Sequence, residues 1–254
     1  MDIPNGHLFR LDTISGEVAH ILEGPVLGAS VLRRDGSLLL LGIHGEIWRW
    51  QGEQHTRVAA VQSIRGTRFN DAIADSTGRV LSGTIPTANQ SSTLYMVARD
   101  GSHRVLATCI GQSNGMALSD DERTLYHADT RAAVVRAYPY DVERGAIGSP
   151  QRVAAFAERD GVPDGMAMDE EGCLWIAMWG GGAVVRLAPS GERVATLRVP
   201  TPLVSSVAFG GPELADLYIT TAGGDNRTSN GRYAGGLFVA RPGVRGAPAH
   251  RSAL

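Results

Sequence analysis

The stretch from Asp164 to Trp179 reads DGMAMDEEGCLWIAMW and contains the unit on which the fold depends. The short apolar run Met166–Met168 is followed by a turn that ends at Gly172, and then by a second apolar run that ends at Trp179. Runs of this length on either side of a glycine turn predict two paired β-strands. A third run, Ala183–Leu187, follows three glycines and extends the pattern to an antiparallel sheet.

Similar units recur along the whole chain. Their openings are Ser30, Asn70, Asn114, Asp164 and Ser206, separated by 40, 44, 50 and 42 residues. The expected second strands are 37–43, 80–85, 124–129, 173–179 and 216–221, and the expected third strands are 46–50, 93–97, 133–137, 183–187 and 237–240. Short strands repeated at this period are typical of a β-propeller, whose blades are four-stranded sheets. A large β-sandwich would not repeat its strand order in this way.

The number of blades depends on the N-terminal segment. His7–Arg10 resembles a sixth third strand and precedes the first opening. Two alternatives follow: six blades, the first without its two opening strands, or five blades and an additional hairpin. We expect an all-β, six-bladed β-propeller with a first blade that lacks its two N-terminal strands, built from residues 1–254 as a single domain.

Composition narrows the range of functions. The 254 residues carry a formal net charge of −2 and include no lysine. Schiff-base chemistry, a Walker P-loop and a Ser-Lys nucleophile are excluded, because each needs the amine of a lysine. The charge predicts no nucleic-acid partner, and no apolar run is long enough to predict a membrane span. The start lacks the pattern of an export signal. Cys109 and Cys173 are interpreted as free, buried thiols, so we expect a cytoplasmic protein.

The unit openings are the candidate site. In a propeller the first strand of each blade lines the central channel, so residues that open different blades should meet at one mouth. Arg68 and Asp71 lie beside Asn70 in this set. One carboxylate with two amide oxygens favours calcium, magnesium or manganese over zinc, and no histidine falls among the openings. Taken singly, Asn or Asp before glycine is also explained by turn formation alone.

The segment Gly111–Gly115 matches the G-x-S-x-G pattern of α/β-hydrolase nucleophiles. That motif works on a turn from strand to helix, with a histidine base arriving later in the chain. Here the following residues, Met116–Ser119, have a strand pattern, so we reject this interpretation. His127 is interpreted as a packing residue.

Four segments together resemble the gluconolactonase/regucalcin family, which also includes senescence marker protein and luciferin-regenerating enzyme. They are Arg68-Phe69-Asn70-Asp71, Ser113-Asn114-Gly115, Pro163-Asp164-Gly165-Met166 and Leu174-Trp175-Ile176-Ala177. The resemblance covers essentially the whole chain. It implies a six-bladed propeller and a divalent-metal-dependent hydrolase that acts on sugar-type lactones.

The resemblance also implies residue roles. In that family a glutamate of the first blade, the asparagine of S-N-G and the aspartate of P-D-G hold the metal, and the last two correspond to Asn114 and Asp164. The cation would be calcium, manganese, magnesium or zinc, with calcium favoured. Arg68 and Asn70 would bind the lactone. Asp164 is the expected general base, because no histidine lines the ring.

Two departures from the family pattern affect these expectations. When the chain is aligned with the family, the strand that carries the metal-binding glutamate would precede Met1. Glu23-Gly24-Pro25 resembles the opening of that strand, but its distance to the next strand is wrong. The chain would then be an incomplete gene model or a natural degenerate form, with impaired metal binding and an open sheet edge for self-association. A family acidic contact is also absent near Ala88, which leaves the preferred lactone open.

Two other functions stay open at this point. One is a non-catalytic propeller that binds a ligand or a metal. The other is hydrolysis of a different ester, such as an organophosphate or an aryl lactone.

Overall fold

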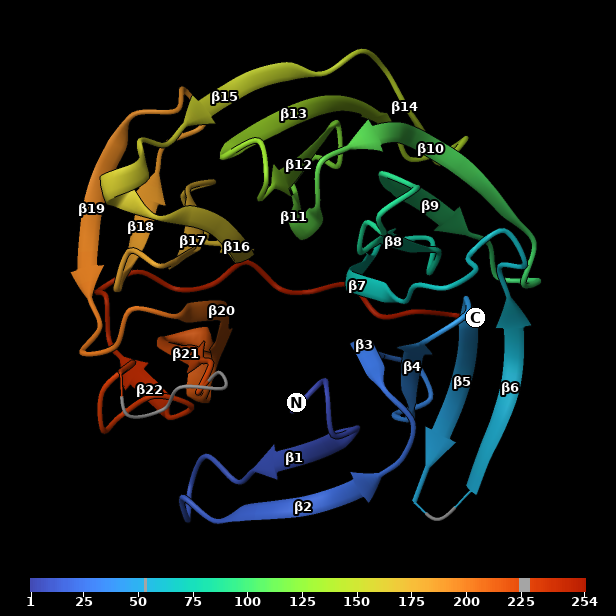
Figure 1. Ribbon diagram of the computed structural model, residues 1–254, viewed down its shortest axis with the longest axis horizontal. Coiled ribbons are helices and arrows are strands. Elements are labelled where there is room, and N and C mark those ends of the chain that lie inside the picture. Colours follow the sequence, from blue (N-terminus) through green and yellow to red (C-terminus); the bar gives the residue numbers. More distant parts are fainter. Residues whose placement is uncertain (53, 224–228) are drawn as a thin grey trace. The chain divides into compact units, whose positions relative to one another are not determined.

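The computed structural model describes residues 1–52, 54–223 and 229–254, which form antiparallel β-sheets joined by short loops (Figure 1). These residues fall into two compact units, 1–110 with 250–254, and 111–249. The helices described are the short 3₁₀ helices η1 (Glu158–Asp160) and η2 (Pro212–Leu214). Neither is long and apolar enough to cross a membrane. The single domain over 1–254 stays a prediction.

The first unit holds a hairpin and two four-stranded blades. The hairpin consists of β1 (His7–Leu11) and β2 (Val18–Glu23). One blade consists of β3 (Leu27–Leu32), β4 (Leu38–Gly42), β5 (Glu46–Gln51) and β6 (Gln54–Ala60). The other consists of β7 (Phe69–Ala74), β8 (Val80–Thr84), β9 (Ser92–Val97) and β10 (His103–Ile110).

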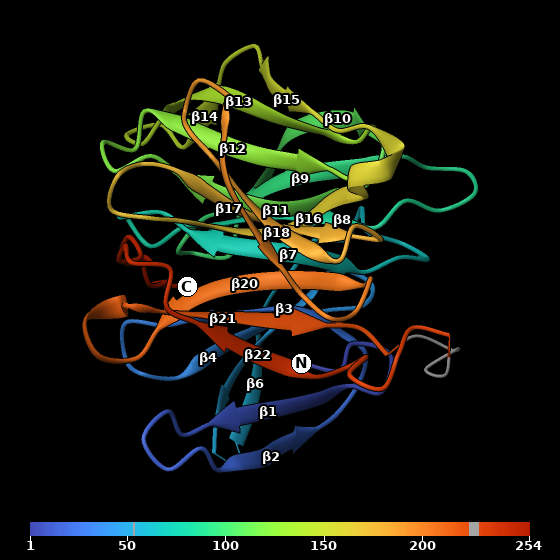
Figure 2. The same cartoon turned by 90° about the vertical axis from the view of Figure 1, so that its left-hand side faces the viewer.

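The second unit holds three blades, the last of which faces the viewer in Figure 2. The first of them consists of β11 (Ser113–Leu118), β12 (Thr124–Asp129), β13 (Val134–Asp141), β14 (Ala146–Ile147) and β15 (Gln151–Ala155). The next consists of β16 (Val162–Met168), β17 (Leu174–Trp179), β18 (Ala183–Leu187) and β19 (Arg193–Arg198). The last consists of β20 (Val204–Gly210), β21 (Asp216–Thr221) and β22 (Leu237–Ala240).

The prediction of six blades with an incomplete first blade is wrong, because the described residues form five blades and a separate two-stranded hairpin. The segment interpreted as a sixth third strand is β1, and β2 is the one strand with which it pairs in the described residues. Leu8 of this hairpin is buried together with Leu27 and Leu40 of the first blade, and Trp48 packs against the same cluster. The hairpin therefore covers its apolar face with an existing blade.

The buried residues explain why the sheets stack. β8 is buried along its whole length, and β17 along all of it except Trp179. In the first unit, Leu39 and Ile47 share one cluster with Phe69 and Val80 of the next blade. A central strand covered on both faces needs apolar side chains in both directions. The outermost strands β6 and β19 are mostly exposed.

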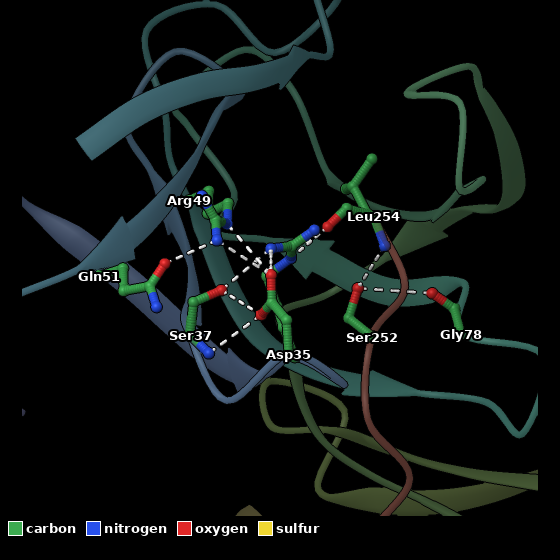
Figure 3. Close-up of polar contacts among 8 residues, drawn as sticks. Asp35, Ser37, Arg49, Gln51, Gly78, Ser252 and Leu254 are labelled. Atoms are coloured by element: carbon green, nitrogen blue, oxygen red, sulfur yellow. Dashed lines mark hydrogen bonds and ion pairs between the residues drawn. The ribbon is translucent and has the colours of Figure 1, made fainter. Parts of the chain in front are cut away.

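An arginine near the end of the third strand recurs for a structural reason. Arg49 Nη2 lies 3.1 Å from Asp35 Oδ2, a residue in the turn between the first two strands of its blade (Figure 3). Arg186 Nε binds Asp169 at 2.7 Å in the equivalent place, and Arg241 Nε binds Asp216 at 2.6 Å. Asp35 and Asp169 lie in the first turn of their blades, so these two pairs join that turn to the third strand, whereas Asp216 is the first residue of β21 and Arg241 directly follows β22.

The segment Ser252–Leu254 pairs with the end of β3 in one blade of the first unit and with the turn between β7 and β8 in the other (Figure 3). Ser252 N–H donates to the Leu32 carbonyl oxygen at 2.9 Å, and Ala253 N–H donates to the Gly78 carbonyl oxygen at 2.9 Å. The Leu254 side chain lies in the apolar cluster of this unit. This segment therefore stabilises the two blades through backbone pairing and apolar contact.

Two further expectations concern exposed groups. Both cysteines are free, as predicted, but only Cys173 is buried, whereas Cys109 is exposed on β10.

The outer edge of β22 pairs with no strand in the described part of the chain. Self-association through such an edge stays a prediction, as does a cytoplasmic location.

Candidate functional site

The first strand of every blade carries a β-bulge near its start. The strand registers shift after Leu27, Phe69, Ser113, Pro163 and Val204. A bulge changes the direction of a side chain and is frequent beside active sites. The residues that follow these positions are Gly28, Asn70, Asn114, Asp164 and Ser205. Ser30 and Ser206, which the sequence repeat placed in this set, lie further along their strands.

Asn114 and Asp164 lie on neighbouring strands of the second unit, since β11 contacts β16 and β16 contacts β20 (Figure 1). The backbones approach so closely that only glycine fits after each of them. A Cβ atom on Gly115 would lie 2.5 Å from the Asp164 carbonyl oxygen, and one on Gly165 would lie 2.8 Å from the backbone Cα of Ser206. The bulged openings of these strands therefore pack backbone against backbone.

Thr130 links these two openings. The Asn114 side chain is 6% exposed, and its Nδ2 donates to Thr130 Oγ1 at 2.8 Å. Thr130 Oγ1 in turn donates to the Pro163 carbonyl oxygen at 2.7 Å, immediately before Asp164. The amide of Asn114 is thus held on one side by a hydroxyl that also contacts the backbone of β16.

Asp129 fixes the loop in front of Asn114. Its carboxylate accepts hydrogen bonds from the backbone N–H groups of Gly111 at 3.1 Å and Gln112 at 3.0 Å, and from Arg136 Nη1 at 2.8 Å. Burial alone raises the pKa of Asp129, but these hydrogen bonds outweigh it and the pKa lies below its ordinary value. Asp129 is therefore an ionised structural anchor.

Ser113, the serine of the G-x-S-x-G pattern, lies on strand β11, in agreement with the strand prediction. It is fully buried, and its Oγ lies 2.7 Å from His127 Nε2. Burial lowers the pKa of His127 to about 4, and Asp129 offsets this only in part. A buried pair on a strand lacks the exposed turn that a nucleophile requires. His127 is a packing residue, as expected.

This buried imidazole predicts a pH dependence of stability. Because the folded-state pKa of His127 lies near 4, below the ordinary 6.5, the unfolded chain binds more protons between these values. The contribution of His127 to stability is therefore lost as the pH falls through this window, by about 2 kcal/mol from pH 7 to pH 5. Urea denaturation at both pH values should show a smaller loss in His127→Gln. The exposed control His103→Gln should lose as much stability between pH 7 and pH 5 as the wild type. If His127→Gln loses as much as this control, the lowered pKa of His127 is wrong.

Arg68 and Asn70 lie together in the first unit, at the opening of β7. Arg68 Nη1 donates to Asn70 Oδ1 at 2.6 Å and to the Phe69 carbonyl oxygen at 2.9 Å. Gly28 of β3 packs against this turn, since a Cβ atom there would lie 1.8 Å from the Phe69 carbonyl oxygen. A hollow of about 430 Å³ beside Arg68 is lined by Ile43, Ile85 and Pro86, among others. Arg68 is thus one of the residues that line this open hollow.

Asp71 is a residue to which sequence reasoning gave no role. Burial raises the pKa of its carboxyl to about 6, against the opposing effect of the nearby Arg68 charge. A raised carboxyl pKa is frequent at functional sites. The signal available in the sequence was only its place beside Asn70, inside a segment that also resembles a turn.

The described residues contain no group of three or more His, Cys, Asp or Glu side chains placed to hold a metal. The predicted donors Asn114 and Asp164 supply an amide oxygen and a carboxylate, which is the donor type that hard cations prefer. A cation there would need water or substrate oxygens to complete its shell.

Comparison with known proteins identifies the relatives of this fold. Residues 1–223 match the model of the SMP-30/Gluconolactonase/LRE-like region. The chain belongs to this family. Pentonolactonase XacC of Haloferax volcanii is 38% identical over 260 residues, which cover 99% of this chain and 89% of that protein. The gluconolactonase/regucalcin resemblance is therefore confirmed.

Two solved structures of family members have the same fold. A luciferin-regenerating enzyme superposes with a TM-score of 0.90 at 26% identity, covering all of this chain and 90% of that one. A regucalcin of Agrobacterium tumefaciens, described as a calcium-binding protein, superposes with a TM-score of 0.87 at 25% identity, covering 98% and 86%. These matches support a β-propeller as the fold class.

Proposed function

We propose that this protein is a divalent-metal-dependent hydrolase of sugar-type lactones. The observation that carries the proposal is the equivalent position of Asn114 and Asp164, each inside the bulge of its strand, on neighbouring first strands. Bulges aim their polar side chains out of the regular pleat, as a binding site requires. A relative named pentonolactonase, 38% identical to this chain, supports the substrate class.

The donor set decides which cation is proposed. Asn114 and Asp164 offer oxygen atoms, and the relative described as calcium-binding supports calcium ahead of manganese, magnesium and zinc. Only one of these two donors is anionic. Because calcium affinity depends on the number of charged ligands, we expect a dissociation constant of roughly 10⁻⁴–10⁻³ M. The family's additional glutamate ligand has no counterpart among the residues that we assign.

In the proposed mechanism the protein's own groups orient the lactone and move a proton. When bound, the cation would supply positive charge that polarises the lactone carbonyl and makes water more acidic. Asp164 accepts the proton of the attacking water as general base. Water adds to the lactone carbonyl carbon, the bond from that carbon to the ring oxygen breaks, and Asp164 returns the proton to the ring oxygen, which gives the hydroxy acid.

Arg68 and Asn70 are proposed to bind the oxygen atoms of the lactone. A guanidinium donates several hydrogen bonds in a fixed plane and suits carbonyl and hydroxyl oxygens. The hollow beside Arg68 has room for a sugar lactone, and Asp71 gives this neighbourhood a further carboxyl group. These assignments account for substrate orientation, the part of catalysis that does not involve bond breaking.

The test removes metal from the protein with EDTA and then measures lactone hydrolysis in a pH-stat, which records the acid released. We expect little turnover of gluconolactone or a pentonolactone by the stripped protein, and recovery when Ca²⁺, Mn²⁺, Mg²⁺ or Zn²⁺ is added in excess. Metal or lactone binding without turnover would favour a non-catalytic propeller. Turnover of aryl esters or organophosphates but not of sugar lactones would assign a different ester substrate. Equal turnover with and without metal would contradict the metal dependence.

A further inference from the structure

We infer that Thr130 is a positioning residue that determines which end of the Asn114 side-chain amide faces the site. The inference rests on the proposed function, in which Asn114 binds the cation through its oxygen atom. Thr130 follows strand β12 and touches neither substrate nor cation in this proposal. It acts through two hydrogen bonds, to Asn114 Nδ2 at 2.8 Å and to the Pro163 carbonyl oxygen at 2.7 Å.

The direction of these bonds follows from the chemistry of the groups. A hydroxyl has a single hydrogen to donate, and a backbone carbonyl oxygen can only accept. The hydrogen of Thr130 therefore goes to Pro163, and only lone pairs remain for Asn114. Asn114 must then present its NH₂ group to Thr130. Its Oδ1 atom is turned to the opposite side of the side chain.

Shape alone would not make this choice, because the nitrogen and oxygen ends of an amide are nearly equal in size. The difference matters for a cation, since the oxygen end attracts it and the NH₂ end repels it. A hydroxyl that must donate elsewhere thus converts an ambiguous side chain into an oxygen ligand. The low exposure of Asn114, 6%, limits the help that solvent could give to the reversed orientation.

The same hydroxyl also sets the position of Asp164. Pro163 directly precedes Asp164, so the bond from Thr130 holds the backbone that carries the carboxylate. Thr130 is itself held by its backbone, since its N–H donates to the Gln112 carbonyl oxygen and its carbonyl oxygen accepts from Ala133 N–H, both at 3.0 Å. One side chain therefore aligns both proposed ligands on their neighbouring strands.

The test is a titration of the metal-free protein with Mn²⁺. Electron paramagnetic resonance detects binding as a loss of the signal of free Mn²⁺. Thr130→Val keeps the side-chain shape and removes the hydroxyl, so we expect about 10–100-fold weaker binding, as for other partners of metal ligands. Thr130→Ser restores the hydroxyl and should bind within about twofold of the wild type. Thr196→Val, an exposed threonine of β19, is the matched control and should not change binding.

The outcomes separate this inference from the proposed function. If Asn114→Ala and Asp164→Asn lose Mn²⁺ binding while a folded Thr130→Val binds like the wild type, the positioning role is wrong and the proposed function stands. If Asn114→Ala and Asp164→Asn both bind like the wild type, the proposed metal site itself is wrong.

A measurement on the wild type keeps the inference testable if Thr130→Val fails to fold. The Asn114 NH₂ resonances, assigned by their absence in Asn114→Asp, should exchange with solvent more slowly than those of the exposed Asn89. Exchange as fast as that of Asn89 would overturn the inference.

Discussion

Asp164→Asn is expected to lower the turnover of sugar lactones by at least about 10³-fold while the protein stays folded. The substitution keeps the size of the side chain and removes both the negative charge and the basicity of the carboxylate. In the proposed site this charge binds the cation and accepts the proton of water, so both contributions are lost together. The measurement is the pH-stat rate at saturating Ca²⁺ or Mn²⁺, with the melting temperature recorded on the same samples.

Asp100→Asn provides the matched control, because Asp100 is an exposed turn aspartate of the first unit that bonds only to its own turn in the described residues. Its turnover should equal that of the wild type. If Asp164→Asn retains wild-type turnover, Asp164 has no catalytic role and the proposed mechanism is wrong. If Asp164→Asn binds lactone and metal normally but turns over slowly, its role is that of a base alone.

Gly115→Ala is expected to destabilise the protein by about 2–4 kcal/mol and to reduce turnover strongly, through a purely steric effect. Its new Cβ atom would lie 2.5 Å from both the Asp164 carbonyl oxygen and the Met166 nitrogen. These are backbone atoms of a paired strand, so they can move only if β16 moves. The displaced strand carries Asp164, and the variant should therefore lose metal affinity as well as stability.

Gly24→Ala tests whether any glycine substitution would have this effect. A Cβ atom on Gly24 meets nothing closer than Leu22 Cγ at 4.0 Å, so its stability should stay within about 0.5 kcal/mol of the wild type. Urea denaturation measures both variants. Wild-type stability and Mn²⁺ affinity in Gly115→Ala would show that the two strands have more freedom than their packing indicates.

Much of the strand pattern could be predicted from the sequence because the blades repeat. The predicted strands 216–221 and 237–240 coincide with β21 and β22, and the predicted 183–187 coincides with β18. The blade number was wrong because a strand pattern does not specify its partners. His7–Arg10 has the composition of a third strand, but only its contacts through Leu8 show that the hairpin packs on an existing blade.

The candidate residues could be predicted in part. Asn70, Asn114 and Asp164 share a repeat position in the sequence, and the structure places each inside the bulge of its strand. Ser30 and Ser206 were assigned to the same set because the extra residue of a bulge leaves no mark on apolar periodicity. Thr130 was missed because its role depends on a hydrogen bond to Pro163, 33 positions away, which no local pattern encodes.

The most direct test of the account is a crystal structure of the protein soaked with Mn²⁺, with the cation located by anomalous scattering. The account predicts one strong peak within about 2.0–2.5 Å of both Asn114 Oδ1 and an Asp164 carboxylate oxygen, with Thr130 on the NH₂ side of the amide. A fully soaked crystal without a peak at these residues, or with its peak at another group of side chains, would contradict it.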